Sequence, residues 1–125
     1  MSNCVFCNYN PAEIIAENRV AFAILDKFPV NEGHTLIIPK RHFNSFFEAT
    51  EEEVKGIYSL MHEVKEMLDI QYEPTGYNVG VNIGYDARQT IMHLHIHLIP
   101  RYKGDIENPR GGIRYLKTPL VEYDG

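Results

Sequence analysis

The sequence predicts one α+β domain, in which an antiparallel sheet of about five strands packs against one long helix. Two observations carry this prediction: several short apolar runs bounded by turn formers, and a single helical pattern over residues 51–71. A third observation, the strict alternation of histidine with aliphatic residues at 93–98, marks one of the strands. The chain has 125 residues, no internal repeat and no linker, so we expect a single domain over 1–125.

Short apolar runs predict three strands in the N-terminal half. Residues 13–16 and 20–25 are expected to form two strands joined by a tight turn at Glu17-Asn18. The loop 26–33 is rich in turn formers and leads to a third strand at 34–39, which ends at a proline. Such short connections favour antiparallel pairing.

The long helix is predicted to begin after Thr50. The segment Thr50-Glu51-Glu52-Glu53 predicts a capping box, and its acidic residues suit the positive end of the helix dipole. Apolar residues then recur at helical spacing and form one face for packing, namely Val54, Ile57, Met61, Val64 and Leu68. Residues 73–76 contain proline and glycine and are expected to end the helix.

The histidine row is the most informative segment. A predicted strand at 77–83 and a loop at 84–90 lead to an apolar run at 90–100, which contains His93, His95 and His97. Successive side chains of a strand point to opposite faces, so the three histidines are predicted to share one face, with neighbours roughly 6.5–7 Å apart. The opposite face, predicted to pack into the core, carries Met92, Leu94, Ile96 and Leu98.

Three imidazoles on one face allow two kinds of chemistry. Imidazole is a nucleophile and an acid–base group near neutral pH, and it is also a common metal ligand. Two histidines at i and i+2 can reach one metal ion, and three can form a catalytic zinc site with an open coordination position. The row by itself leaves both kinds open.

The only two cysteines, Cys4 and Cys7, form a C-x-x-C pair. In a reducing compartment such a pair is a metal clip or a redox dithiol. A redox pair is expected at the start of a helix that follows a strand, whereas a turn-forming segment follows Cys7. The pattern therefore favours zinc, which needs two further ligands.

Composition narrows the class of protein. The apolar content of 44 % and the charged content of 23 % are typical of a soluble globular domain. The net charge of −5 gives no support for a nucleic-acid or membrane partner. The first residues show no signal peptide, and no apolar run approaches the ~18 residues of a membrane span. We therefore expect a cytoplasmic protein.

The tail at 101–125 is irregular and, up to residue 117, mostly basic. Its basic residues are Arg101, Lys103, Arg110, Arg114 and Lys117. The pair Gly111-Gly112 allows close approach of the backbone to another group. A positive segment in an acidic protein can face an anionic ligand, but a solvated tail has the same composition.

These motifs together resemble the histidine-triad (HIT) family. The resemblance rests on Cys4-Val5-Phe6-Cys7, on Ile37-Ile38-Pro39-Lys40-Arg41-His42, on Asn82 and Gln89-Thr90, and on the row His93-Leu94-His95-Ile96-His97-Leu98-Ile99-Pro100-Arg101. It covers most of the chain, and residues 104–112 resemble prokaryotic members described as diadenosine polyphosphate hydrolases. It implies a HIT-like domain with a nucleotide as substrate and a homodimer as the assembly.

The resemblance also implies a mechanism. His95, the middle histidine, would attack the α-phosphate of a nucleotide and form a covalent nucleotidyl-histidine intermediate, which water then hydrolyses. His97 would hydrogen-bond a phosphoryl oxygen or protonate the leaving group. Related nucleotidyl transferases carry Gln at the position of His97, so a histidine there favours hydrolysis.

Further roles follow from the resemblance alone. A structural zinc ion would be held by Cys4, Cys7, His42 and His93, and this assignment weakens the alternative of a catalytic three-histidine zinc site. Asp26 would bind the ribose hydroxyls, Phe22 and Ile24 would line the base pocket, and Asn82, Gln89 and Thr90 would contact the phosphates. His34 is expected to buttress the site. Arg88 replaces a glycine that is common in the family and has no assigned role.

Two alternative functions remain open from the sequence. One is a nucleoside phosphoramidase, which would use the same mechanism on a P–N bond. The other is a nucleotide-binding or zinc-stabilised interaction module without catalysis, against which the intact histidine row argues.

Overall fold

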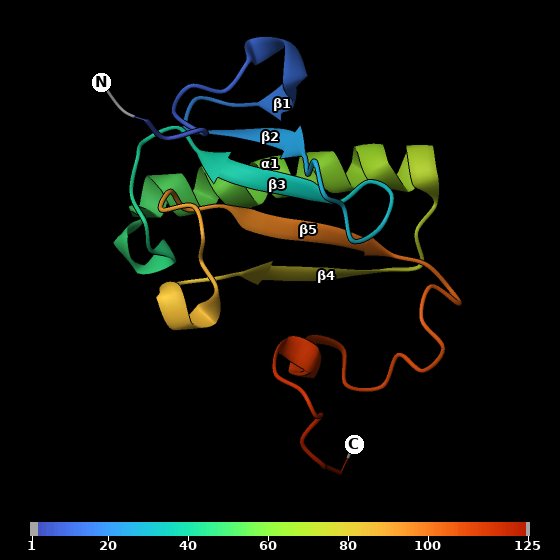
Figure 1. Ribbon diagram of the computed structural model, residues 1–125. Helices are drawn as coiled ribbons and strands as arrows, with labels where there is room; N and C mark the ends of the chain where they lie inside the picture. Colours follow the sequence, from blue (N-terminus) through green and yellow to red (C-terminus); the bar gives the residue numbers. More distant parts are fainter. Residues whose placement is uncertain (1–2, 125) are drawn as a thin grey trace.

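The computed structural model describes residues 3–124 and contains a five-stranded antiparallel sheet with one long helix on one face (Figure 1). The elements are β1 (Ile14–Glu17), β2 (Ala21–Leu25), β3 (Thr35–Pro39), α1 (Glu51–Tyr72), β4 (Gly76–Val81) and β5 (Ile96–Arg101). The predicted α+β architecture is confirmed. The predicted domain also includes residues 1, 2 and 125, which lie outside the described part of the chain.

Strand β5 lies inside the sheet, because the strand order is β1-β2-β3-β5-β4. Its antiparallel neighbours place His97 between Leu36 of β3 and Gly80 of β4. A side chain added at Gly80 would meet nothing within 4 Å, so the glycine leaves open space beside His97. The sheet therefore fixes the backbone of His97 from both sides and keeps its ring accessible.

Helix α1 packs its apolar side on the sheet and forms the main core. The buried apolar residues of the helix are Ile57, Leu60, Val64 and Leu68. The predicted helix face was wrong at Val54, which is 38 % exposed, and it omitted the buried Leu60. Leu60 lies three residues after Ile57 and four before Val64, so it shares their face. Val54 lies in the first turn and borders an apolar groove beside β4.

The prediction that one strand carries the whole histidine row was wrong at its start. Strand β5 begins at Ile96, so of the three histidines only His97 lies in the sheet. The segment that contains His93 and His95 forms backbone hydrogen bonds outside the sheet, since the N–H of Leu94 donates to the carbonyl of Phe43 at 2.7 Å. The predicted alternation of histidine and core side chains still holds at Leu94, which is fully buried in the core. It fails at Met92, which was predicted to pack into the core and is 42 % exposed.

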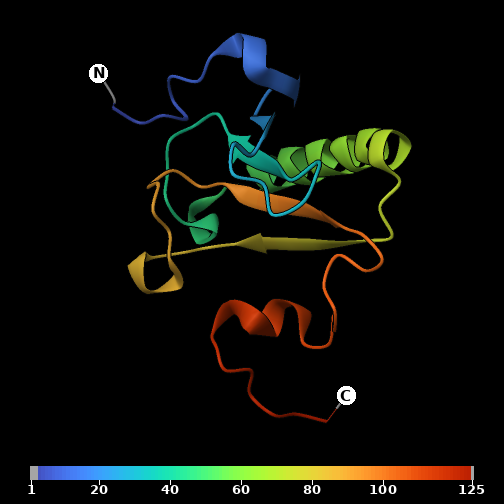
Figure 2. The same cartoon turned by 45° about the vertical axis from the view of Figure 1, so that its right-hand side comes forward.

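The tail lies beyond the β4 edge of the sheet, below that strand in both ribbon views (Figures 1 and 2). A short 3₁₀ helix, Gly112–Leu116, contributes to a cavity whose other wall is formed by β4 and β5. The tail and the sheet thus line one cavity, which includes His97. Within residues 3–124, no helix combines the length and apolar character needed to cross a membrane.

The start of α1 is tied to the loop after β3 by a buried carboxylate. Glu53 closes the predicted capping box with Thr50 and also binds the guanidinium of Arg41 through two hydrogen bonds of 2.8 Å. The Arg41 hydrogen bonds lower the pKa of Glu53 to about 2, against the opposing effect of burial. The ion pair therefore holds Arg41, and with it the neighbouring His42, against the helix.

We predict that Glu53→Gln lowers the free energy of unfolding at pH 7 by about 1–3 kcal/mol, the range for a hydrogen bond to a charged group. Because the pKa of Glu53 is lowered in the folded state, this contribution is present above its unfolded pKa of ~4.3 and is lost as the pH falls toward 2. Denaturant unfolding from pH 7 to pH 2 should show the two proteins converging. The control is Glu51→Gln, an exposed change in the same helical turn; equal destabilisation by both variants would contradict the prediction.

Candidate functional site

The ring of His95 is fixed in one tautomer by the backbone. Its Nδ1 lies 2.9 Å from the carbonyl oxygen of His93, which can only accept, so Nδ1 carries the proton. In the neutral form of the ring, the lone pair is therefore on Nε2. The residue is only 9 % exposed, and its ring centroid lies 5.4 Å from that of His97. The backbone thus directs Nε2 of His95, not Nδ1, to act as the nucleophile beside a second imidazole.

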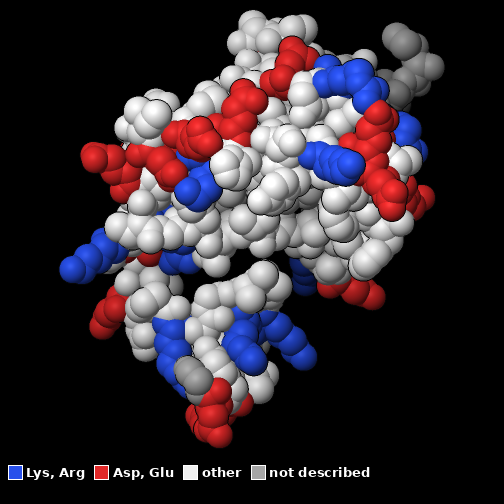
Figure 3. All heavy atoms as spheres, turned by 180° about the vertical axis from the view of Figure 1, so that it is seen from behind, with Lys and Arg blue, Asp and Glu red and all other residues white. Residues whose placement is uncertain are grey.

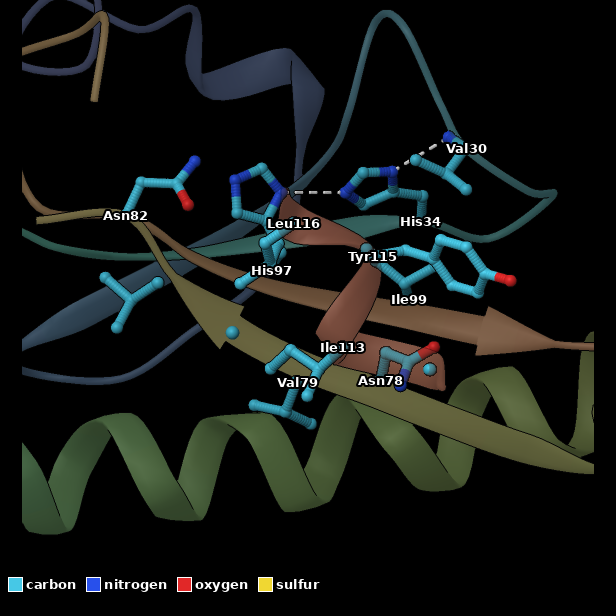
Figure 4. A pocket seen from close by; sticks show the side chains of 13 residues that line it. Val30, His34, Asn78, Val79, Asn82, His97, Ile99, Ile113, Tyr115 and Leu116 are labelled. Carbon is cyan, nitrogen blue, oxygen red and sulfur yellow. Dashed lines mark hydrogen bonds between the residues drawn. The ribbon is translucent and has the colours of Figure 1, made fainter. Parts of the chain in front are cut away.

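His97 lines a cavity of about 500 Å³ between the sheet and the tail (Figure 4). The polar side chains of its wall are His34, Asn78, Asn82 and His97, with a tyrosine and aliphatic residues around them. Burial, with the neighbouring His95 and His34 as smaller causes, lowers the pKa of His97 to about 4, although Asp26 opposes the shift. The ring is therefore neutral at pH 7, and it acts there as a hydrogen-bonding group.

Four ligand-type side chains converge at the N-terminal segment. Cys4, Cys7, His42 and His93 bring their Sγ and ring-nitrogen atoms within 4.8 Å of one another and could hold a metal ion. Three Sγ–Nδ1 distances are 3.2, 3.3 and 3.6 Å. Ligands of a tetrahedral zinc ion, with Zn–S of about 2.3 Å and Zn–N of about 2.05 Å, lie about 3.6 Å apart, so the spacing fits zinc.

His93 is prepared for ligation by its other nitrogen. Its Nε2 donates to the carbonyl oxygen of Pro39 at 2.8 Å, which leaves a lone pair on the Nδ1 that faces the sulfur atoms. A metal-binding histidine commonly donates its second nitrogen to a carbonyl in this way. Burial lowers the pKa of His93, which also favours the neutral ring that a metal requires.

The alternative of one metal ion shared by all three histidines of the row is wrong for the described residues. His93 belongs to the cysteine cluster, whereas His97 belongs to a separate cluster with Asp26 and His34. The ring of His95 lies between them, with its Nδ1 engaged by the backbone. The row therefore serves two sites.

Phe6 connects these two sites, and the sequence prediction gave it no role. Its ring packs edge-on against His93, with centroids 5.8 Å apart, and against His95 at 5.2 Å. Phe6 is buried in a second apolar cluster with Phe22, Ile24, Leu36 and Ile38. The only sequence signal for it is an aromatic residue inside the C-x-x-C pair.

The residues predicted to bind the nucleoside lie near Phe6 and His34. Phe22 and Ile24 are buried beneath the N-terminal segment, in the cluster that contains Phe6. Asp26 follows β2 and bonds the N–H of Phe28 through Oδ1, while its Oδ2 lies 3.4 Å from Nε2 of His34. Their contacts with a base and a ribose stay predictions.

The predicted phosphate contacts are divided among different environments. Asn82 follows β4 and lies next to His97 in the cavity wall (Figure 4). Thr90 is exposed, whereas Gln89 is buried and binds the backbone of Gly84, Asn44 and Ile91. Gln89 thus holds the loop before the histidine row, and a direct phosphate contact would have to replace one of these bonds.

Arg88 lies in the left-handed backbone region, with a φ of 71°. Residues other than glycine rarely adopt this backbone conformation. The loop geometry therefore explains why a glycine suits this position in the family that the sequence resembles. This chain accepts a strained arginine one residue before Gln89.

Three basic residues of the tail, Arg101, Arg110 and Arg114, are engaged within the chain. The guanidinium of Arg101 binds both carboxylate oxygens of Asp105 and the side chain of Asn78. Arg110 and Arg114 stack on the ring of Tyr123. The described residues lining the cavity include no lysine or arginine, so the basic tail does not form a cationic wall in this arrangement.

Comparison with known proteins agrees with this arrangement. A family model described as HIT domain matches residues 8–104. An uncharacterised 16.1 kDa HIT-like protein of Mycoplasma pneumoniae is 38 % identical over 106 residues, which cover 82 % of this chain and 74 % of that protein. The crystal structure of a zinc-bound histidine triad family protein from Mycobacterium smegmatis superposes with a TM-score of 0.74 at 34 % identity, covering 82 % of this chain and 78 % of the other.

A relative with a named activity is more distant. The asymmetrical bis(5'-nucleosyl)-tetraphosphatase of Schizosaccharomyces pombe is 28 % identical over 94 residues, which cover 75 % of this chain and 52 % of that enzyme. The similarity therefore spans about half of the yeast protein.

Proposed function

The chain belongs to the HIT family, and from this premise we propose that it is a nucleotide hydrolase that cleaves phosphoanhydrides of the diadenosine polyphosphate type at the α-phosphate. The observation that carries the proposal is the tautomer of His95. Its Nδ1–H donates to a carbonyl oxygen, so the lone pair of the neutral ring is on Nε2, and the ring lies beside that of His97. The similarity to a tetraphosphatase supports the choice of substrate class.

The proposed reaction has two displacements at phosphorus. Nε2 of His95 attacks the α-phosphorus, a P–N bond forms, and the P–O bond to the leaving group breaks with its electron pair on oxygen. Water then attacks the same phosphorus, the P–N bond breaks, and a nucleoside monophosphate leaves while His95 is restored. Covalent catalysis of this kind replaces one difficult displacement by two easier ones.

His97 is proposed to stabilise the charge that develops in both displacements. A neutral ring at pH 7 is a hydrogen-bond donor to a phosphoryl or leaving-group oxygen, and a bound polyphosphate would raise its low pKa and allow proton transfer. Asn82, in the same cavity wall, is proposed as a second donor. Asp26, Phe22 and Ile24 are proposed to bind the nucleoside, with Gln89 and Thr90 near the phosphates.

A structural zinc ion is proposed at Cys4, Cys7, His42 and His93. Two thiolates and two imidazoles make a closed coordination set, and the zinc-bound relative from Mycobacterium smegmatis supports the assignment. When bound, zinc would tie the N-terminal segment to the loop after β3 and to the start of the histidine row. Its role here is stability and the placement of Phe6, which contacts His95.

A homodimer is proposed through the side of the sheet that ends at β4. Strand β4 is an edge strand, so its outer backbone groups have no partner strand within residues 3–124. An apolar groove beside it is lined by Phe46, Val54, Ile57, Tyr58, Met61, Val79, Gly80, Val81 and Ile96. Seen from the helix side, charged residues gather over the upper body, and uncharged side chains lie between them and the tail (Figure 3). An exposed apolar surface along a strand edge fits a second copy.

The proposed function predicts that the purified protein hydrolyses diadenosine tetraphosphate to a mononucleotide. His95→Ala should lower the turnover rate by several orders of magnitude while nucleotide binding remains measurable. The control is His62→Ala, which removes an exposed histidine from α1. Product formation is followed by chromatography, with an adenosine phosphoramidate assayed in parallel. A higher kcat/KM for the phosphoramidate would favour the phosphoramidase alternative, and turnover of neither would favour a non-catalytic module.

Metal analysis of protein purified without added zinc should find about one equivalent per chain, the stoichiometry of one closed four-ligand site. Cys7→Ser should lose most of the metal and lower the melting temperature, whereas His62→Ala should change neither. Chelation should lower the melting temperature of the wild type more than that of Cys7→Ser, because metal binding is linked to folding. A metal-free wild type with a Cys4–Cys7 disulfide would support the redox dithiol instead.

The dimer predicts a sedimentation mass of twice the 14.4 kDa chain. Tyr58→Glu places a charge in the apolar groove and should shift the equilibrium toward the monomer. Ile70→Glu is the control, since Ile70 is exposed on the same helix and lies outside the groove. A monomeric wild type, or equal masses for both variants and the wild type, would rule out this interface.

A further inference from the structure

His34 is a buried histidine held between a backbone N–H group and the ring of His97 (Figure 4). The N–H of Val30 donates to Nδ1 of His34 at 3.0 Å. A backbone N–H can only donate, so Nδ1 of His34 must hold a lone pair. A neutral imidazole has one N–H group, and in His34 it is therefore on Nε2.

That N–H group points at His97. Nε2 of His34 lies 2.9 Å from Nδ1 of His97 and 3.4 Å from Oδ2 of Asp26, so the shorter contact is the hydrogen bond. Nδ1 of His97 is then the acceptor, and the proton of the neutral His97 ring is on Nε2. This second nitrogen is on the side of the ring that faces Asn82 and the cavity (Figure 4).

The loop that supplies the Val30 N–H group is itself fixed. The N–H of Asp26 donates to the carbonyl of His34 at 2.9 Å, and the N–H of His34 donates to that of Asn31 at 3.1 Å. The side chain of Asn31 donates to the carbonyl of Pro100 and to Asp105. The donor that sets the tautomer of His34 is thus part of a closed loop anchored to the end of β5.

The same side chains could also be interpreted as a metal site, because ligand atoms of Asp26, His34 and His97 lie within 4.8 Å of one another. Ligation through Nε2 of His34 would require the proton to move to Nδ1. Two N–H groups, those of Val30 and His34, would then face each other at 3.0 Å. The Val30 hydrogen bond therefore favours a chain of donors over a metal ion.

We propose that His34 is a positioning residue: it sets the tautomer of His97, so that a neutral His97 presents an Nε2–H donor to the phosphoryl group. The catalytic consequence rests on the proposed function, whereas the tautomer does not. The arrangement supplies a correctly placed donor at neutral pH without protonating the ring. A histidine in the opposite tautomer would direct a lone pair at the phosphoryl oxygen and repel it.

The tautomer can be measured directly in the zinc-loaded protein. Long-range ¹H–¹⁵N correlation spectra at pH 7.5 distinguish the protonated from the unprotonated nitrogen of each ring. The expected result for the wild type is a protonated Nε2 and an unprotonated Nδ1 in both His34 and His97. A protonated Nδ1 in His97 would overturn the proposal, whether or not the protein turns over any substrate. So would a second zinc equivalent that binds at His34 and His97.

Two amide variants separate the tautomer role from simple packing. In His34→Gln the amide nitrogen takes the place of Nε2 and still donates to His97. In His34→Asn the amide oxygen takes the place of Nδ1 and accepts from the N–H of Val30, and the shorter side chain does not reach His97. We expect His34→Gln to keep the His97 tautomer and a kcat within a few-fold of the wild type. We expect His34→Asn to give a mixture of tautomers and a fall in kcat on the order of 10²-fold, with little change in KM.

The leaving group gives an independent measurement. Loss of a donor should slow a substrate with a poor leaving group more than a nitrophenyl ester of the same nucleotide, whose leaving group needs no proton. His34→Asn should therefore widen the rate difference between the two substrates, and His34→Gln should not. Equal losses in both variants with an unchanged His97 tautomer would show that His34 only fills space. Melting temperatures establish that each variant is folded.

Discussion

One ring nitrogen of each histidine in the row is held by a fixed hydrogen-bonding partner, and this constraint decides what the other nitrogen can do. Nε2–H of His93 donates to the carbonyl of Pro39, and Nδ1–H of His95 donates to the carbonyl of His93. Three chemically identical side chains thereby become different groups. His93 turns a lone pair toward two sulfur atoms, while His95 keeps a lone pair on Nε2. The backbone carbonyls around the row therefore decide which nitrogen of His93 and of His95 can bind a metal ion or attack a substrate.

The position of β5 makes these hydrogen bonds possible. Because β5 lies between β3 and β4, its start meets the end of β3, where Pro39 supplies a carbonyl. The same antiparallel register brings the loop before β3 next to His97. Phe6 then packs against both His93 and His95, so the metal-binding cluster and the nucleophile share one aromatic contact. Stability of the N-terminal segment and alignment of the site are therefore linked through packing.

The electrostatics of the site are unusual for a protein proposed to bind polyphosphates. Arginine side chains near the cavity are paired with acidic or aromatic groups of the same chain, and the described cavity wall is neutral. Neutral donors, namely the ring of His97 and the amide of Asn82, are left to meet an anion. In a buried site such donors interact strongly with developing charge, and they need no counter-ion when the site is empty.

The sequence by itself determined the parts of this protein that depend on local pattern. The capping box at Thr50, most of the strands and the alternation of the histidines could be predicted, because side-chain periodicity and turn chemistry act over a few residues. The full metal-ligand set followed only from the resemblance to the HIT family. Only the tertiary structure decided which nitrogen of each ring is free, that Phe6 joins the two sites, and that Arg101 pairs with Asp105. These outcomes depend on contacts between segments that are distant in the chain, such as Pro39 with His93 or Val30 and His34 with His97, and no periodicity records them.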